Sequence, residues 1–366
     1  MSNISKYKYA GKKVFNISKF DAADKGEFDN REEAVEEFIS NLHEINNLQQ
    51  KLYAARKEGV IFVFQAMDAA GKDGVIRTVF STLTPHGVKE YCFKTPSSEE
   101  SSHDYLWRFW QAMPARGNIS IFNRSYYEDV LIGRVHSLYK NQLWPDRLSG
   151  VDMVEDRYQQ INDFESYLYS TGTRVVKIFL NVSKDEQARR FLSRIDTPKK
   201  NWKVSSGDIE ERKYWDDYMD AFEIMVNRTS TKNSPWYVVP ADHKWYCRLI
   251  VSRIVLETLK EMKPQYPELD EEEINKFGEM REGLVNDLGD NITDEDPEGG
   301  FSIFKSPDLI AEAIIKTEEK EKIDEKTRET VEKVFDNIRS LADAGYSLHD
   351  KTELVTAMFF DEKDNK

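Results

Sequence analysis

The chain of 366 residues is poor in cysteine and has no long apolar run. Its two cysteines, Cys92 and Cys247, have neither the spacing of a metal site nor that of a disulfide framework. No stretch approaches the ~18 consecutive apolar residues that span a bilayer, and the polar start MSNISKYKYAGKK lacks a signal-peptide core. These absences predict a cytoplasmic protein without a membrane partner.

The first 263 residues have no excess of negative charge, although the whole chain is acidic. Residues 264–366 hold 29 acidic and 13 basic side chains, a net charge of −16, whereas residues 1–263 carry +2 within a total of −14. A polyanionic substrate would be tolerated by the first part and repelled by the second. We expect no nucleic-acid partner.

The stretch FQAMDAAGKDGVIRTVF, residues 64–80, lacks two residues of the usual phosphate-loop pattern. That pattern is glycine, four residues, glycine, lysine, then serine or threonine. Gly71 and Lys72 are in register, but Ala66 replaces the first glycine and Asp73 replaces the hydroxyl. The pattern alone is therefore insufficient, and its surroundings have to decide.

Those surroundings favour a phosphate site over a structural turn. The loop follows the apolar stretch 60–65, a predicted buried strand, and opens a predicted helix at Lys72, so its amides and the helix N-terminus converge. A lysine at a helix N-terminus is unfavourable unless an anion compensates it. The loop residues expected to bind the phosphate are Ala69, Ala70, Gly71, Asp73 and Gly74.

Two carboxylates accompany this loop. Asp68 and Asp73 would repel a phosphate unless metal ions or arginines intervene, which favours a magnesium-dependent reaction over mere binding. The alternative for Asp68 is a carboxylate that caps nearby amides.

A second group of polar residues ends the predicted strand 118–122. Asn123, Arg124 and Glu128 follow it directly. Ligands of open parallel sheets lie beyond the carboxyl ends of the strands, so these residues are expected near Lys72. Arg124 suits a transferring phosphoryl group, although an ion pair with a nearby acid is the alternative.

Strands and helices alternate through the first 263 residues. The predicted strands are 60–65, 88–93, 118–122, 174–182 and 236–240, and the predicted helices are 29–58, 72–80, 102–113, 151–170, 184–195, 209–227 and 242–262. This alternation predicts an α/β fold in three layers, with a parallel sheet between helices.

A basic helix and a polar loop follow the fourth strand. Arg190 and Arg194 are four residues apart and so share a helix face, next to the loop 196–208. Such a segment, at about residues 190–216, can close over phosphates as a lid, and a solvated helix face is the alternative.

The two ends of the chain read differently from this core. Residues 1–28 look irregular, residues 264–300 read as an acidic linker, and residues 301–366 regain helical patterning as a C-terminal extension. The core is predicted to comprise residues 29–263.

Three motifs resemble the polyphosphate kinase 2 family. They are QAMDAAGKDGVIR, FNRSYYEDVL and RRFLSRIDTPKKNWKVSSGDIEERKYWDDYMDAFE, which look like its phosphate loop, its second-strand motif and its lid. The resemblance covers roughly residues 30–262, and SYYEDVL together with Asn123 is similar to the class III subgroup, which phosphorylates both AMP and ADP with inorganic polyphosphate.

The resemblance implies a thymidylate-kinase-like P-loop fold, Mg²⁺ dependence with Mn²⁺ as a substitute, and assembly into a dimer or tetramer. It implies that Asp68 organises metal and the accepting phosphate, and that Lys72 and Arg124 contact the transferred phosphoryl group. Arg190 and Arg194 match basic lid positions, and which of them reaches the phosphate stays open. Ala66 departs from the usual glycine of the family.

The sequence thus predicts reversible transfer of a phosphoryl group between polyphosphate and AMP, ADP or ATP. A polyanion needs a basic groove, for which the candidates are Arg134, Lys89, Lys94 and Arg116. An ATP-dependent nucleoside or nucleotide kinase of related fold is the first alternative, and a non-catalytic phosphate-binding module is the second.

Overall fold

A six-stranded sheet organises the protein. The computed structural model describes residues 4–141, 145–148 and 152–288. The strand order is β1-β6-β5-β2-β4-β3, and the strands are β1 Lys8–Tyr9, β2 Gly59–Ala66, β3 Val88–Cys92, β4 Ile119–Asn123, β5 Thr173–Asn181 and β6 Trp236–Pro240. All pairs are parallel except β1 with β6. The expected parallel sheet is confirmed, with one antiparallel edge strand added.

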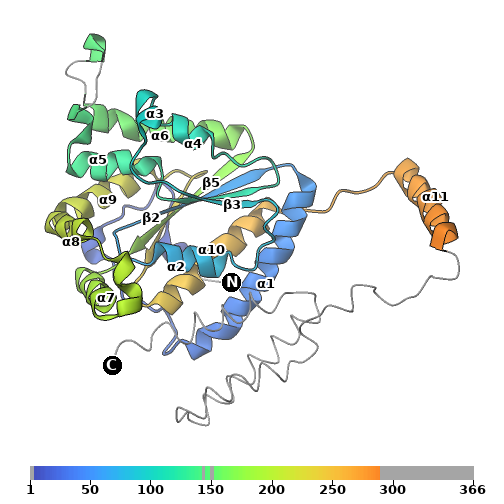
Figure 1. Cartoon of the computed structure of the whole chain (residues 1–366), viewed down its shortest axis with the longest axis horizontal. Helices are drawn as coiled ribbons and strands as arrows, with labels where there is room; N and C mark the ends of the chain where they lie inside the picture. Colours follow the sequence, from blue (N-terminus) through green and yellow to red (C-terminus); the bar gives the residue numbers. More distant parts are fainter. Residues whose placement is uncertain (1–3, 142–144, 149–151, 289–366) are drawn as a thin grey trace, which may run out of the picture. The chain divides into compact units, whose positions relative to one another are not determined.

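Helices cover both faces of this sheet and make the three layers (Figure 1). Helices α1, α2 and α10 lie on one face, and α4, α6 and α9 lie on the other. The α-helices are α1 Glu32–Ala55, α2 Lys72–Val79, α3 Ser98–Ser102, α4 Trp107–Trp110, α5 Ile132–Val135, α6 Met153–Ser170, α7 Lys184–Asp196, α8 Ser206–Glu211, α9 Trp215–Thr229, α10 Lys244–Met262 and α11 Glu271–Leu288. Short 3₁₀ helices are η1 Ser5–Tyr7, η2 Ile17–Lys19, η3 Tyr126–Val130, η4 Leu138–Asn141, η5 Asp146–Leu148, η6 Pro198–Lys203 and η7 Arg212–Tyr214.

The core lies where the central strands are covered on both sides. Residues 59–65 of β2 are all buried, as are residues 175–181 of β5, because each strand has helices above and below it. Parallel strands that start in register also end in register. The carboxyl ends of β2 and β4 therefore lie side by side, with Phe64 opposite Asn123.

The N-terminal segment is more ordered than its sequence suggests. Residues expected to be irregular include β1, and Tyr7, Tyr9 and Phe15 are buried there. Aromatic side chains explain the difference, because they pack on one another at ring distances such as 5.2 Å between Tyr9 and Phe15.

Two helix starts differ from the sequence prediction. The first helix was expected to begin at residue 29, but α1 begins at Glu32. Just before it, the side chain of Asn30 accepts the Glu33 amide, at 3.2 Å.

The helix expected over 102–113 is also divided. A capping box formed by Ser97 and Glu100 starts α3 early, and the Asp104 side chain accepts the Leu106 amide before α4 begins. Such a local side-chain bond competes with helix continuation.

The described residues divide into two compact units, one ending at Gln265 and the other beginning at Tyr266. Within the second unit, α11 forms inside the segment expected to be an acidic linker. Its start carries a capping box that the sequence prediction missed, because Glu273 donates its amide to Asp270 Oδ1 at 2.8 Å and accepts the Asp270 amide at 3.1 Å. The extension expected at 301–366 lies outside the described residues.

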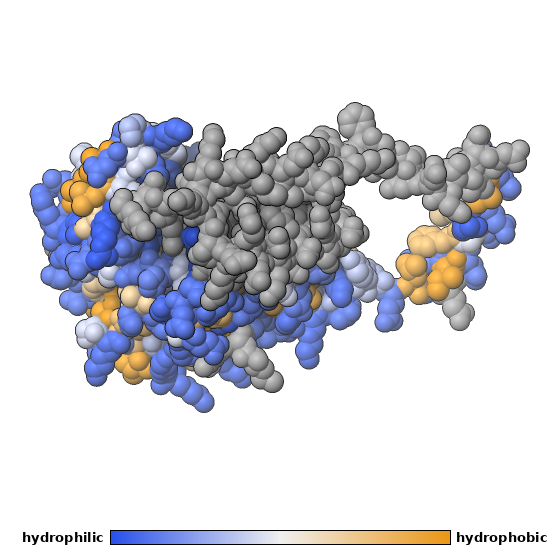
Figure 2. Space-filling model, turned by 90° about the horizontal axis from the view of Figure 1, so that it is seen from below, coloured by the Kyte–Doolittle hydropathy of each residue, from blue (hydrophilic) through white to orange (hydrophobic). Residues whose placement is uncertain are grey.

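Helix α11 also has an apolar side. Its large hydrophobic side chains Ile274, Phe277, Met280 and Leu284 are exposed. In Figure 2, hydrophobic residues coloured orange gather on this helix. Within the described parts of the chain, no helix is both long enough and apolar enough to cross a membrane.

Candidate active site at the carboxyl ends of β2 and β4

The loop from Met67 to Gly71 joins β2 to α2 at the carboxyl edge of the sheet. Ala70 donates its amide to Met67 O at 3.2 Å, which closes a tight turn. Ala69 has a φ of 62° and Gly71 a φ of 106°, so two of five residues adopt the left-handed region. Only glycine reaches the second value without strain, and this explains why Gly71 precedes the helix. Such turns point successive amides to one side and form anion-binding concavities.

Lys72 is buried at the first position of α2. Its ammonium donates to Ala66 O at 2.9 Å, so the residue that replaces the usual first glycine supplies a carbonyl ligand for the lysine. Burial lowers the pKa of Lys72 below its ordinary value, although the charge of Asp68 opposes this shift. The Lys72 ammonium is thus shielded from solvent and close enough to Asp68 for their charges to interact.

Asp68 and Arg124 form an ion pair in front of that lysine. Arg124 Nη2 lies 2.7 Å from Asp68 Oδ1. Burial alone would raise the pKa of Asp68, but the charges of Lys72 and Arg124 outweigh it and lower the pKa. The carboxylate is therefore ionised at neutral pH.

The backbone of Arg124 is itself unusual. Its φ is 65°, and its amide bonds Phe64 O at 3.1 Å, so the chain turns sharply out of β4. Non-glycine residues held in this region cluster at functional sites. Glu128 follows one turn later, 3.8 Å from Arg124 Nη1, and burial raises its pKa although Arg124 opposes the shift.

Asn123 belongs to a neighbouring polar group. Its amide nitrogen lies 2.9 Å from Asp73 Oδ1 and 3.1 Å from Glu90 Oε1. Asp73 thus accepts a hydrogen bond from Asn123. The position of Gly74, next to it, faces Arg248 of α10. The sequence prediction placed Asn123 and Asp73 in the same region, but it did not foresee this bond or Glu90.

The two lid arginines occupy different environments. Arg190 is buried, and its guanidinium donates to backbone carbonyls of the loop and of residues 241–242. Arg194 is partly exposed, and its charge acts on Asp68. It also acts on Asp208 of α8, whose pKa is raised by burial and by Asp68. The sequence analysis did not predict Asp208 near the site, because it lies far along the chain in a stretch whose sequence was read as a polar loop.

Arg134, predicted to bind substrate, contacts another part of the protein. Its Nη1 lies 3.6 Å from Glu155 Oε1 on α6. The structure thus pairs it with an acid of the protein surface, whereas Asp68, Lys72, Arg124 and Glu128 are brought together.

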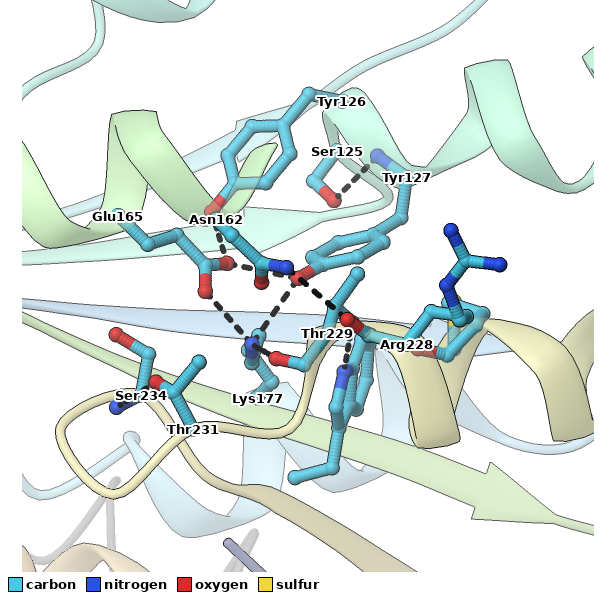
Figure 3. Close-up of polar contacts among 12 residues, drawn as sticks. Ser125, Tyr126, Tyr127, Asn162, Glu165, Lys177, Arg228, Thr229, Thr231 and Ser234 are labelled. Atoms are coloured by element: carbon cyan, nitrogen blue, oxygen red, sulfur yellow. Dashed lines mark hydrogen bonds and ion pairs between the residues drawn. The ribbon is translucent and has the colours of Figure 1, made fainter. Parts of the chain in front are cut away.

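A buried polar network lies behind η3 (Figure 3). Tyr126 and Tyr127 donate to Glu165 Oε1 at 2.9 and 2.8 Å, and Lys177 Nζ lies 2.6 Å from Glu165 Oε2. Lys177 also donates to Thr229 O at 2.6 Å. Since these tyrosines sit between Arg124 and Glu128 in sequence, the network fixes the segment that carries both site residues.

The acids at the site suit a hard divalent cation, but they do not enclose one. No cluster of three or more histidine, cysteine, aspartate or glutamate residues able to hold a metal occurs among the described residues. Mg²⁺ commonly binds through one or two carboxylates, several waters and substrate phosphates. Ionised Asp68, whose charge also acts on Asp208, matches that requirement.

Comparisons with known proteins agree on one family. The family model described as Polyphosphate kinase 2 matches residues 27–267. The chain is 45% identical to the ADP-polyphosphate phosphotransferase of Rhodopseudomonas palustris, over 75% of this chain and 98% of that one. It is 42% identical to the AMP/ADP-polyphosphate phosphotransferase of Meiothermus ruber, over 72% and 96%. The crystal structure of polyphosphate kinase 2 from Arthrobacter aurescens TC1 superposes with a TM-score of 0.70 at 37% identity, over 77% and 97%.

Proposed function

The chain belongs to the polyphosphate kinase 2 family, and from this premise we propose that it transfers the terminal phosphoryl group of inorganic polyphosphate to AMP or ADP. The transfer is reversible, and polyphosphate can thereby regenerate ATP. The similarity to a relative named for both AMP and ADP supports the class III subgroup. The structural observation that carries the proposal is the meeting of Asp68, Lys72 and Arg124 at the carboxyl ends of β2 and β4.

The protein does not need to form a covalent bond to the substrate for this reaction. Phosphoryl transfer depends on alignment of donor and acceptor and on neutralising charge at the transferred group. The loop amides and Lys72 would hold one phosphate, and Arg124 would swing from Asp68 to the transferring group when substrate enters. Removing one such cation typically costs about 10²–10³ in rate.

We place Mg²⁺ at Asp68, with Asp208 as a further oxygen ligand when the lid carries it inward, and Mn²⁺ as a substitute. When bound there, the metal would supply positive charge that neutralises the phosphates during transfer. Arg194 is the lid arginine that we assign to the phosphate, because it is partly exposed and its charge reaches Asp68.

A coupled assay tests the function. The protein is incubated with Mg²⁺, polyphosphate and ADP, and in a parallel reaction with AMP, and nucleotides are separated by chromatography. We expect ATP from ADP and ADP from AMP. Formation of neither product would contradict the proposal.

The donor separates this reading from the alternative kinase. The same reactions with ATP in place of polyphosphate, and AMP or a nucleoside as acceptor, should be much slower. Faster transfer from ATP would favour an ATP-dependent nucleotide kinase. We further propose a cytoplasmic homo-oligomer, which light scattering of the purified protein tests.

A further inference from the structure

Arg190 makes contacts that leave it no free donor. Nε donates to Glu186 Oε1 at 2.9 Å. Nη1 donates to Ala69 O at 3.2 Å and to Ala70 O at 2.7 Å. Nη2 donates to Ala241 O at 2.6 Å and to Asp242 O at 3.0 Å. A guanidinium has five N–H groups, and all five are used.

These contacts determine which way the backbone amides of the loop point. In a trans peptide the carbonyl oxygen and the next amide hydrogen point in opposite directions. Arg190 holds the carbonyls of Ala69 and Ala70 toward α7, and Gln187, also on α7, donates to Asp68 O at 2.8 Å. The amides of Ala69 and Gly71 therefore face away from α7. Since the Ala70 amide is used within the turn, these two remain to meet an anion.

The clamp is buried and braced. Arg190 and Gln187 are 9% and 1% exposed, and a Cβ on Gly71 would lie 3.6 Å from Arg190 Nη1, so the guanidinium lies directly under the loop. Arg212 of η7 donates to Gln187 Oε1 at 2.5 Å and to Lys184 O at 3.0 Å. If Arg190 turned to contact a phosphate, four backbone carbonyls would lose its hydrogen bonds, and leaving buried acceptors unpaired is unfavourable.

We propose that Arg190, assisted by Gln187, is a positioning residue that clamps the loop 67–71 with its amides turned toward the phosphate, and that it does not itself bind polyphosphate. The role given to Arg190 rests on the proposed function, but the exchange experiment that tests it does not need that function. It assigns the two lid arginines different tasks: Arg190 shapes the cradle, and Arg194 approaches the substrate.

Hydrogen–deuterium exchange of the ligand-free full chain tests the clamp. In Arg190→Met, amides of the peptide covering residues 66–74 should exchange at least tenfold faster than in the parent protein, while residues 119–123 of β4 stay unchanged. The matched control is Arg189→Met on the same helix. Arg189 is 63% exposed and pairs only with the same Glu186 in the described structure, so its loop exchange should match the parent.

Affinity for tripolyphosphate, measured by calorimetry, completes the test. It should fall at least tenfold in Arg190→Met, and Arg190→Lys should not restore it, because one ammonium cannot reach both pairs of carbonyls. Restored affinity in Arg190→Lys, or lost affinity with unchanged loop exchange, would overturn the proposal in favour of direct binding. Unchanged exchange and unchanged affinity would overturn it altogether.

A second variant covers the case in which Arg190→Met does not fold. Gln187→Met keeps the volume and removes the bond to Asp68 O, so loop exchange should rise about threefold. No rise would contradict the clamp. Because exchange is measured without substrate or turnover, failure of the polyphosphate assay would leave this result intact.

Discussion

At the scale of single residues, the site depends on how Asp68, Lys72 and Arg124 share a small volume. Lys72 and Arg124 are both cations, and the ionised Asp68 between them lowers their mutual repulsion in the ligand-free protein. In the proposed reaction, an incoming phosphate would replace the carboxylate as the partner of Arg124, and Asp68 would then be free to hold a metal ion.

Asp68→Asn separates binding from turnover. The amide keeps the shape but loses the charge, so polyphosphate affinity should stay within about threefold while the rate of ATP formation falls by about 10²–10³. Calorimetry and the coupled assay measure the two. Asp163→Asn, on the exposed side of α6, is the control. Turnover within tenfold of the parent protein would remove Asp68 from the reaction.

The buried carboxyl group of Asp129, next to Glu128, should make the stability of the protein depend on pH. Burial raises its pKa to about 6, although Arg157 opposes the shift. A carboxyl whose pKa is raised on folding binds more protons in the folded state, so its contribution to the free energy of unfolding falls as pH rises from about 4 to about 6.

Asp129→Asn should remove that slope. Relative to the parent protein, the free energy of unfolding of the variant should increase by about 2 kcal/mol between pH 4 and pH 6.5, because the ionisation cost of roughly two pKa units is absent. Urea unfolding at several pH values measures it. Parallel pH profiles for the two proteins would show that Asp129 has an ordinary pKa.

At the scale of elements, a buried ion pair in the core holds η3 in place. Lys177 of β5 and Glu165 of α6 are almost fully buried, and Tyr126 and Tyr127 complete the network (Figure 3). A paired buried charge contributes little in itself, but removing one partner leaves the other uncompensated. The network therefore acts as a specific brace for the segment between Arg124 and Glu128.

Lys177→Met should destabilise the protein by about 3–5 kcal/mol because Glu165 is left as an unpaired buried charge. Urea unfolding measures the loss. The double variant Lys177→Met with Glu165→Gln removes the stranded charge and should recover at least half of it. A loss below about 1 kcal/mol in the single variant would mean that Glu165 takes up a proton at little cost.

Element positions were largely predictable from the sequence, and their exact ends were not. Apolar runs identified β2, β5 and β6, because strands buried on both faces leave a continuous apolar stretch. Helix starts depended on local side-chain bonds at Asn30, Ser97 and Asp270, which compete closely with neighbouring residues of similar chemistry.

The site was predictable where sequence neighbours set it. The loop and the end of β4 each carry their residues in one short motif, so the sequence predicts that Asp68, Lys72 and Arg124 lie together, and the structure brings them together. Asp208 and the task of Arg190 depend on how α7 and α8 pack, which no local pattern encodes. The direction of a guanidinium toward backbone carbonyls is a property of the tertiary structure.

At the scale of the whole molecule, catalysis is expected to reside in the unit that ends at Gln265. The family model ends at residue 267, and the Meiothermus ruber relative is covered over 96% of its length by 266 aligned residues. Residues 268–366 lie beyond the match to the family model, and their net charge of −16 would repel a polyanion.

A chain ending at Gln265 should therefore keep its turnover number within about twofold. Because an acidic segment repels a polyphosphate chain, the KM for polyphosphate should not rise and should fall at low salt. Steady-state kinetics at two ionic strengths measure both quantities, with thermal unfolding as the check on folding. A turnover number reduced more than tenfold in a folded protein would place a catalytic task in the C-terminal residues.

The most direct test is the rate of ATP formation from ADP and saturating polyphosphate with Mg²⁺ in Lys72→Met. The side chain keeps its length but loses the buried ammonium, and we predict a fall of about 10³ or more. The control is Lys57→Met, an exposed lysine that precedes β2 at the opposite edge of the sheet, which should match the parent protein. A Lys72→Met enzyme that is as fast as the parent would show that the loop between β2 and α2 does not hold the transferred phosphate.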